Sequence, residues 1–113
     1  MQCEHPCHKL SFTLSVIESQ IPAGVSGIYA FWYRGYCVYV GKTEKQSLRA
    51  RLVKHWENSH NSGLNSWIRA KRAELKVSCL PVADKGTIAS FERYYIKRLQ
   101  PLTNRVLFVS VRP

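Results

Sequence analysis

Glu92 is a carboxylate at a position where an apolar residue would be expected. Residues 87–99 are predicted to form a helix whose apolar side chains share one arc. At about 100° per residue, Glu92 falls inside that arc. A carboxylate on the core side of a helix costs free energy unless a cation or hydrogen-bond donors compensate it. Two interpretations stay open: a structural salt bridge or rim position, and a ligand for a divalent metal such as Mg²⁺, which prefers oxygen donors.

Arg51 and His55 form a second candidate group. They are four residues apart within residues 47–57, which are predicted to form a helix, so they lie on one face. Two cationic groups side by side are mildly unfavourable unless something anionic lies between them. The pair could belong to a solvated basic face with Arg49 and Lys54. Alternatively it could bind a phosphate, with Arg51 on an oxygen and His55 as proton acceptor.

Two tyrosines, Tyr29 and Tyr39, lie in neighbouring strands. Residues 27–34 and 36–41 are rich in aromatic and β-branched side chains and are predicted to form a β-hairpin. Packing explains most strand tyrosines, but each of these must also place a hydroxyl group. Lys42, just past the second strand, could lie over a phosphate.

A cluster of metal-type ligands lies near the N-terminus. Cys3, His5, Cys7 and His8 are zinc-binding residue types, but their spacing lacks the usual C-x₂-C or H-x₃-H pairing. A tail without bound zinc is the favoured interpretation, and zinc binding is the alternative.

The charge balance indicates a polyanionic partner. The 113 residues carry 17 Lys and Arg against 7 Asp and Glu, a formal net charge of +10. A basic run between helix and strand is either a solvated face or a nucleic-acid track; it comprises Arg69, Lys71, Arg72 and Lys76. No apolar run is long enough to cross a bilayer and no secretory signal is evident, so a cytoplasmic protein without membrane association is expected.

The elements that position these residues mix strands and helices without a βαβ repeat. Residues 10–16 alternate and are predicted to be a strand or extended arm, and residues 105–111 a terminal strand. A second short helix ends near Ala73, a strand runs from Leu75 to Pro81, and Thr87 is the expected cap of the last helix. This order favours an α+β fold, a small and mostly antiparallel sheet flanked by helices.

Taken together, these residues resemble the GIY-YIG nuclease family. The two tripeptides that name the family read Gly27-Ile28-Tyr29 and Tyr39-Val40-Gly41, with Val in place of Ile in the second. The family pattern continues with Arg51 and His55 on a helix, Glu92 on a later helix, and Asn104 after it. The match divides the chain into an N-terminal arm and short strand (1–26), a nuclease-like domain (27–104) and a C-terminal strand or tail (105–113).

The resemblance implies a divalent-metal-dependent endonuclease that hydrolyses DNA phosphodiester bonds, with Mg²⁺ or Mn²⁺ as cofactor. Low sequence specificity is expected, and RNA is not excluded as a substrate. The alternative is a binding module that holds nucleic acid on the same scaffold without cutting it.

The resemblance also assigns roles to residues. Tyr29 would act as general base or orient the attacking water, His55 would assist it, and Tyr39 would line the site. Arg51 would stabilise charge on the phosphate, Glu92 would bind the metal and Asn104 would brace the site. The cations around Tyr29 would favour its phenolate form. The expected nucleic-acid-binding residues are Lys42, Arg49, Lys54, Arg69, Lys71 and Arg72.

Overall fold

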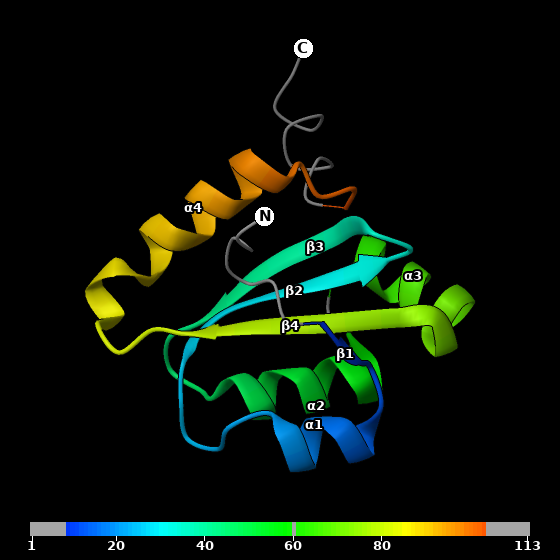
Figure 1. Cartoon of the computed structure of the whole chain (residues 1–113), viewed down its shortest axis with the longest axis horizontal. Helices are drawn as coiled ribbons and strands as arrows, with labels where there is room; N and C mark the ends of the chain where they lie inside the picture. The colour runs from blue at the N-terminus through cyan, green and yellow to red at the C-terminus, as the bar shows by residue number, and fades with distance from the viewer. Residues whose placement is uncertain (1–8, 60, 104–113) are drawn as a thin grey trace.

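A four-stranded antiparallel sheet with helices on both faces organises the chain (Figure 1). The computed structural model describes residues 9–59 and 61–103. The strands lie in the order β1-β4-β2-β3. In chain order the elements are β1 (Leu10–Ser11), α1 (Leu14–Gln20), β2 (Gly27–Tyr33), β3 (Tyr36–Thr43), α2 (Leu48–Asn58), α3 (Ser62–Lys71), the 3₁₀ turn η1 (Arg72–Glu74), β4 (Leu75–Pro81), the 3₁₀ turn η2 (Lys85–Thr87) and α4 (Ile88–Leu99). The predicted α+β class is confirmed.

The predicted hairpin is confirmed as β2 and β3. Arg34 and Gly35 make the turn between the strands with φ of 49° and 86°. The pairing shifts between Phe31 and Trp32, so β3 carries one extra residue at this irregularity. The apolar faces of both hairpin strands predict a central position; this is confirmed for β2 and wrong for β3, which lies at the edge of the sheet.

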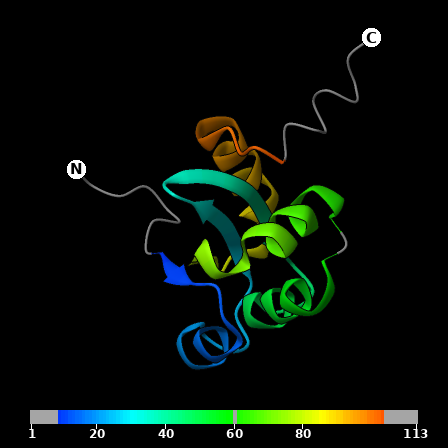
Figure 2. The same cartoon turned by 90° about the vertical axis from the view of Figure 1, so that its right-hand side faces the viewer.

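The two faces of the sheet pack against different helices (Figures 1 and 2). Tyr29 and Phe31 face the layer formed by α1, α2 and α3. Ile28 and Ala30, the alternate residues of β2, face α4 on the opposite side, where Tyr95 packs against them. Because β3 is at the edge, side chains from α2 and from α4 can both reach its outer side.

The predictions for α2, α3 and β4 are confirmed. The Ser47 side chain accepts a hydrogen bond from Ala50 N at 3.0 Å and caps α2. Asn61 caps α3 in the same way through Leu64 N at 2.8 Å. These caps fix where each helix begins, and so they fix which residues of α2 face the sheet.

The strand predicted for residues 10–16 is wrong beyond Ser11. Thr13 accepts a hydrogen bond from Val16 N and starts α1, whose buried residue is Ile17. The alternation of apolar residues concealed a helical spacing that continues to Ile21, which is also buried. A cap and a buried helical face therefore outweigh a period of two.

Thr87 is the N-cap residue of α4, as predicted, but its side chain does not cap the helix. Its hydroxyl donates to the Asp84 carbonyl oxygen at 2.8 Å and makes no cap hydrogen bond. The Asp84 side chain instead accepts from Gly86 N and starts the η2 turn, which leads into α4. On α4, Phe91 is exposed, so the buried arc is narrower than the sequence predicts.

Some predictions fall on residues that the structure does not describe: the terminal strand at 105–111, the site residue Asn104, and the cluster of Cys3, His5, Cys7 and His8. Within residues 9–59 and 61–103, no helix has the length and apolar character needed to span a membrane.

Candidate active site

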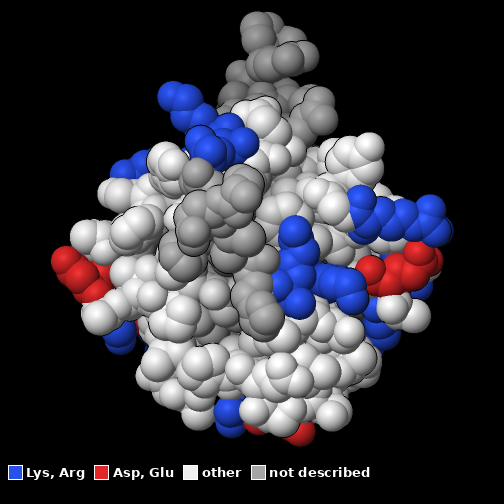
Figure 3. Space-filling model, in the orientation of Figure 1, with Lys and Arg blue, Asp and Glu red and all other residues white. Residues whose placement is uncertain are grey.

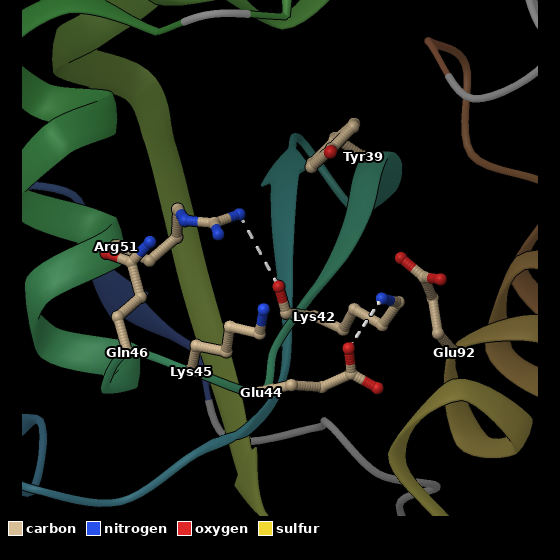
Figure 4. Close-up of a pocket in the computed structure, with 7 residues that line it drawn as sticks. All are labelled: Tyr39, Lys42, Glu44, Lys45, Gln46, Arg51 and Glu92. Carbon is tan, nitrogen blue, oxygen red and sulfur yellow. Dashed lines mark hydrogen bonds and ion pairs between the residues drawn. The ribbon is translucent and has the colours of Figure 1, made fainter.

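A cleft of about 420 Å³ lies along the outer edge of β3, where residues from three segments meet. Figure 4 shows Arg51 approaching from α2 and Glu92 from α4, with Tyr39 of β3 between them. The residues that line the cleft are Tyr39, Lys42, Glu44, Lys45, Gln46, Arg51 and Glu92. The fold thus brings together residues that are up to 53 positions apart in the sequence, from Tyr39 to Glu92.

Gly41 allows the two tyrosines to share one side of the sheet. Tyr29 is directly opposite Gly41 across the hairpin, and Tyr39 lies two positions before that glycine. A Cβ atom on Gly41 would overlap the ring and hydroxyl of Tyr29 and would lie 2.8 Å from Tyr39 Cε2. The ring centroids of the two tyrosines are 6.0 Å apart. A side chain at position 41 would therefore displace both rings.

A chain of hydrogen bonds leads from Tyr29 away from the cleft. The Tyr29 hydroxyl is 2.8 Å from His55 Nε2, and His55 Nδ1 is 2.8 Å from Ser59 Oγ. All three side chains are buried. The expected pairing of Tyr29 with His55 is therefore present in the structure, and Ser59 extends it.

Burial, rather than the nearby cations, controls the ionisation of the tyrosines. Desolvation raises the pKa of Tyr29 well above its ordinary value, and the proximity of Arg51 lowers it only in part. Burial likewise raises the pKa of Tyr39, and the Glu92 carboxylate raises it further. The expectation that surrounding cations make Tyr29 a phenolate is therefore wrong for the protein alone.

Arg51 is held at the side of the cleft by two neighbours. With its amide oxygen facing the guanidinium, Gln46 accepts hydrogen bonds from Arg51 Nη2 at 3.0 Å and Nε at 3.1 Å. Arg51 Nη1 also donates to the Lys42 carbonyl oxygen at 3.5 Å. Gln46 is not predicted as a site residue from the sequence, where its one signal is its position directly before Ser47, the cap of α2. Since Gln46 occupies two donors, Arg51 is fixed in direction before any anion binds.

Glu92 points its carboxylate into the cleft (Figure 4). It is half-buried, and no hydrogen bond or ion pair joins it to another residue in the described ranges. Burial raises the pKa of the Glu92 carboxyl, Glu44 raises it further, and Lys42 and Arg93 act in the opposite direction. Lys42 itself pairs with Glu44, Nζ to Oε1 at 3.1 Å. The salt-bridge interpretation of Glu92 is therefore not what the described residues show.

The donor set around Glu92 fits a hard divalent cation. Glu92 has no ion-pair partner among the described residues, and its carboxylate and the Tyr39 hydroxyl are oxygen donors that face the same cleft. The described residues hold no group of three or more His, Cys, Asp or Glu side chains arranged as a metal cage. Mg²⁺ commonly uses one or two carboxylates and keeps several water ligands, so a single Glu is sufficient.

A second cleft of about 330 Å³ continues from the first. Tyr39, Gln46 and Arg51 line both, and the second adds Lys54, His55, Asn58 and Asn61. Lys54 is exposed at its rim. The two clefts form a polar track along the β3 edge and the exposed side of α2.

Four of the expected nucleic-acid-binding residues lie outside the two clefts: Arg49, Lys71 and Arg72 have intramolecular contacts, and Arg69 is exposed on α3. Arg49 Nε donates to the Ile21 carbonyl oxygen at 2.9 Å. Arg72 lies 4.1 Å from the Trp56 ring centroid, and Lys71 lies 5.7 Å from that of Tyr33. On the face shown in Figure 3, Lys and Arg side chains form separate groups rather than one continuous patch.

The chain passes close to β3 again after α4. Thr103, the last residue described before Asn104, donates from its backbone N to the Val38 carbonyl oxygen at 2.8 Å. The placement of Asn104 itself lies outside the described residues. Its assignment to the site therefore stays a prediction.

Comparison with known proteins supports this arrangement. The model of the GIY-YIG catalytic domain matches residues 25–105. No curated protein sequence gives a significant match. Among solved structures, the chain is similar to the GIY-YIG N-terminal endonuclease domain of UvrC from Thermotoga maritima bound to its catalytic divalent cation, magnesium. That comparison gives a TM-score of 0.61 and 21% identity over 79% of this chain and 91% of that chain.

An asparagine-to-alanine mutant of the same domain, bound to its catalytic divalent cation, gives a TM-score of 0.59. Its identity is 22% over 79% of this chain and 90% of that chain. At this identity, the likeness supports the fold.

Proposed function

Because this chain belongs to the GIY-YIG family, we propose that it is a divalent-metal-dependent endonuclease that hydrolyses DNA phosphodiester bonds. The observation that carries the proposal is the cleft at the β3 edge. It combines Arg51, a fixed cation, with Glu92, a partly buried carboxylate that pairs with no residue of 9–59 or 61–103, on either side of Tyr39. An anion clamp facing a partly buried carboxylate is poorly explained by packing alone.

In this proposal the scissile phosphate lies in the cleft. Arg51 binds a phosphate oxygen and stabilises the charge that develops on it as water attacks phosphorus. Glu92 holds Mg²⁺ or Mn²⁺, and the cation would supply Lewis-acid stabilisation of the phosphate and the leaving oxygen when bound. Lys42 adds positive charge beside the same cleft. Asn104 is proposed to brace the site.

Tyr29 and His55 handle the proton of the attacking water. Since burial disfavours a free phenolate at Tyr29, we propose a relay. The Tyr29 oxygen takes the water proton while the Tyr29 hydroxyl proton passes to His55 Nε2, 2.8 Å away. As the new O–P bond forms, the bond from phosphorus to the leaving oxygen breaks. Solvent protonates that oxygen, and Tyr29 stays a neutral phenol throughout.

Phosphate contacts, rather than base contacts, would bind the substrate. Lys54 at the rim of the second cleft is placed for a neighbouring phosphate. Arg49, Arg69, Lys71 and Arg72 would act farther from the scissile bond. Such contacts carry no sequence information, so we propose low intrinsic sequence specificity.

A cleavage panel tests the function. Supercoiled plasmid, linear duplex and branched DNA are incubated with the protein and Mg²⁺, Mn²⁺ or EDTA. We expect cleavage of at least one substrate with either metal and none in EDTA. Tight DNA binding without metal-dependent cleavage of any substrate would instead indicate a non-catalytic binding module. An RNA duplex in the same panel determines whether RNA is also cut.

A further inference from the structure

Ser59 lies directly after α2, where the backbone leaves the helix in an extended conformation. This change of direction returns its side chain towards the last turn of α2, and Ser59 Oγ lies 2.8 Å from His55 Nδ1. Ser59 is 7% exposed and His55 6%, so water competes little for this contact. A buried contact between two side chains four residues apart restricts the rotation of the imidazole ring.

The neighbours of Ser59 decide in which direction its hydroxyl points. Asn61 N donates to Ser59 Oγ at 3.3 Å, which occupies one lone pair. The Ser59 hydroxyl proton is directed to the Asn61 carbonyl oxygen at 3.5 Å, which can only accept. The remaining lone pair of Ser59 Oγ therefore faces His55 Nδ1, which suits an N–H donor.

The contact at Nε2 of His55 indicates the same tautomer, with the proton on Nδ1. A neutral imidazole carries one N–H, so a proton on Nδ1 leaves a lone pair on Nε2. The Tyr29 hydroxyl lies 2.8 Å from Nε2, and as a neutral phenol it carries the proton that this lone pair can accept. Among the described residues, the titratable and charged groups that face the ring include Tyr29 on β2, Tyr39 on β3, and Arg51 and Lys54 on α2.

We infer that Ser59 is a positioning residue for the reaction. Its oxygen accepts the Nδ1–H of His55 and so keeps Nε2 as the proton acceptor for Tyr29. The inference rests on the proposed nuclease function for its role in catalysis, but the tautomer exists without substrate. Ser59 touches neither the phosphate nor the water. It acts through His55, as the third member of a catalytic triad acts through its histidine. When His55 gains the proton from Tyr29, the same Ser59 oxygen stabilises the imidazolium.

The test measures the His55 tautomer in the full chain by long-range ¹⁵N–¹H NMR of the ring nitrogens, at a pH where the imidazole is neutral. The His55 signals are identified by their loss in His55→Gln. We expect the Nδ1–H form in the wild type and in Ser59→Thr, which keeps the hydroxyl. We expect a shift towards the Nε2–H form in Ser59→Ala and in Ser59→Cys, a near-isosteric and weak acceptor.

Cleavage kinetics supply the second readout. Loss of one neutral hydrogen bond to the base predicts a fall in kcat of about five- to tenfold for Ser59→Cys, with KM unchanged and activity retained in Ser59→Thr. Ser66→Ala is the matched control, since Ser66 donates only to the Ser62 carbonyl oxygen on the exposed side of α3. It should change neither the tautomer nor the rate.

An Nε2–H tautomer in the wild type, or no change in the tautomer of Ser59→Cys, would overturn the inference whatever the cleavage results. This outcome is separate from failure of the proposed function. A wild type that holds the Nδ1–H form but cuts no substrate would count against the nuclease, while the placement of Ser59 would stand.

Discussion

At the scale of single residues, Glu92 couples activity to stability. Its carboxylate is half-buried, and no described residue forms a hydrogen bond or ion pair with it. Burial raises the pKa of Glu92, so its charge at neutral pH costs the folded protein free energy. A bound divalent cation would offset that cost. The residue is therefore unfavourable for folding but suited to hold a metal.

This coupling gives a pH-dependent prediction for Glu92→Gln. Because the folded pKa is raised, Glu92 is protonated in both the folded and unfolded states below about pH 4.3, its ordinary value, and costs nothing there. As pH rises through the raised folded pKa, the unfolded chain releases its proton more readily and the wild type loses stability. We expect Glu92→Gln to melt at a higher temperature than the wild type at pH 7 in EDTA, and the difference to shrink towards pH 4.

Adding Mg²⁺ should raise the melting temperature of the wild type and leave that of Glu92→Gln unchanged. Differential scanning calorimetry at several pH values checks both expectations. A variant that is less stable than the wild type at pH 7 would show that Glu92 has a stabilising partner, contrary to its role as a vacant ligand.

At the scale of elements, the β2–β3 hairpin does more than support the site. Tyr29 and Tyr39 share a face because the strands pair with Tyr29 opposite Gly41. The glycine leaves the space that the Tyr29 hydroxyl and the Tyr39 ring occupy. Consequently, the motif glycine is a steric requirement of the tyrosine pair and not only a feature of the strand end.

We expect Gly41→Ala to destabilise the fold by roughly 1–3 kcal/mol, because the added methyl group overlaps Tyr29 and the neighbouring rings must shift. The shift of the Tyr29 and Tyr39 rings should also lower the cleavage rate by at least about 100-fold, because catalytic groups must be held closely in place. Urea unfolding and single-turnover cleavage measure the two effects. Gly86→Ala is the control, because Gly86 is exposed and its nearest neighbour would be the flexible Asp84 side chain at 3.2 Å. Equal cleavage in Gly41→Ala and wild type would refute the steric account.

The sequence predicted the elements that have one dominant signal. The hairpin has aromatic and β-branched strands around a tight turn, and α2 has a serine cap followed by leucines at helical spacing. Residues 14–20 were wrongly predicted to continue a strand, because Leu14 and Val16 fit a period of two. Ile17 and Ile21 fit the spacing of a helix. Local alternation does not reveal which face the rest of the molecule will cover.

The candidate site was predictable for the residues that belong to the motif and less so for those that support it. Gln46 and Ser59 act through Arg51 and His55, and their roles depend on distances that only the folded chain sets. The phenolate expectation for Tyr29 was wrong for a similar reason. The sequence shows the cations, but it does not show how completely the ring is buried.

At the scale of the whole molecule, the net charge of +10 is spread over several elements. The two adjoining clefts share Arg51, and Lys54 lies at the exposed rim of the second. Arg49 and Arg72 instead donate to backbone carbonyl oxygens. Only part of the basic surface is therefore free to form a path for a DNA backbone.

DNA affinity should fall steeply with salt, as counterion release requires. We expect Lys54→Ala to lower the slope of log K against log salt by about 1, since it removes one phosphate contact. Lys76→Ala should leave the slope unchanged, because Lys76 is on β4 and β2 separates that strand from β3. Fluorescence anisotropy across a salt series measures both slopes. An equal reduction of the slope in Lys54→Ala and Lys76→Ala would indicate that the whole basic surface attracts DNA, without a defined binding path along the clefts.

Single-turnover DNA cleavage by Glu92→Gln, in saturating Mg²⁺, tests the central claim most directly. Glu57→Gln is the matched control, since Glu57 is an exposed carboxylate near the end of α2 and lines neither cleft. We expect Glu57→Gln to cut like the wild type and Glu92→Gln to lose at least about 1,000-fold, the order expected when electrostatic stabilisation of the transition state is removed. Equal cleavage rates in wild type and Glu92→Gln would contradict the assignment of this cleft as the active site of a metal-dependent nuclease.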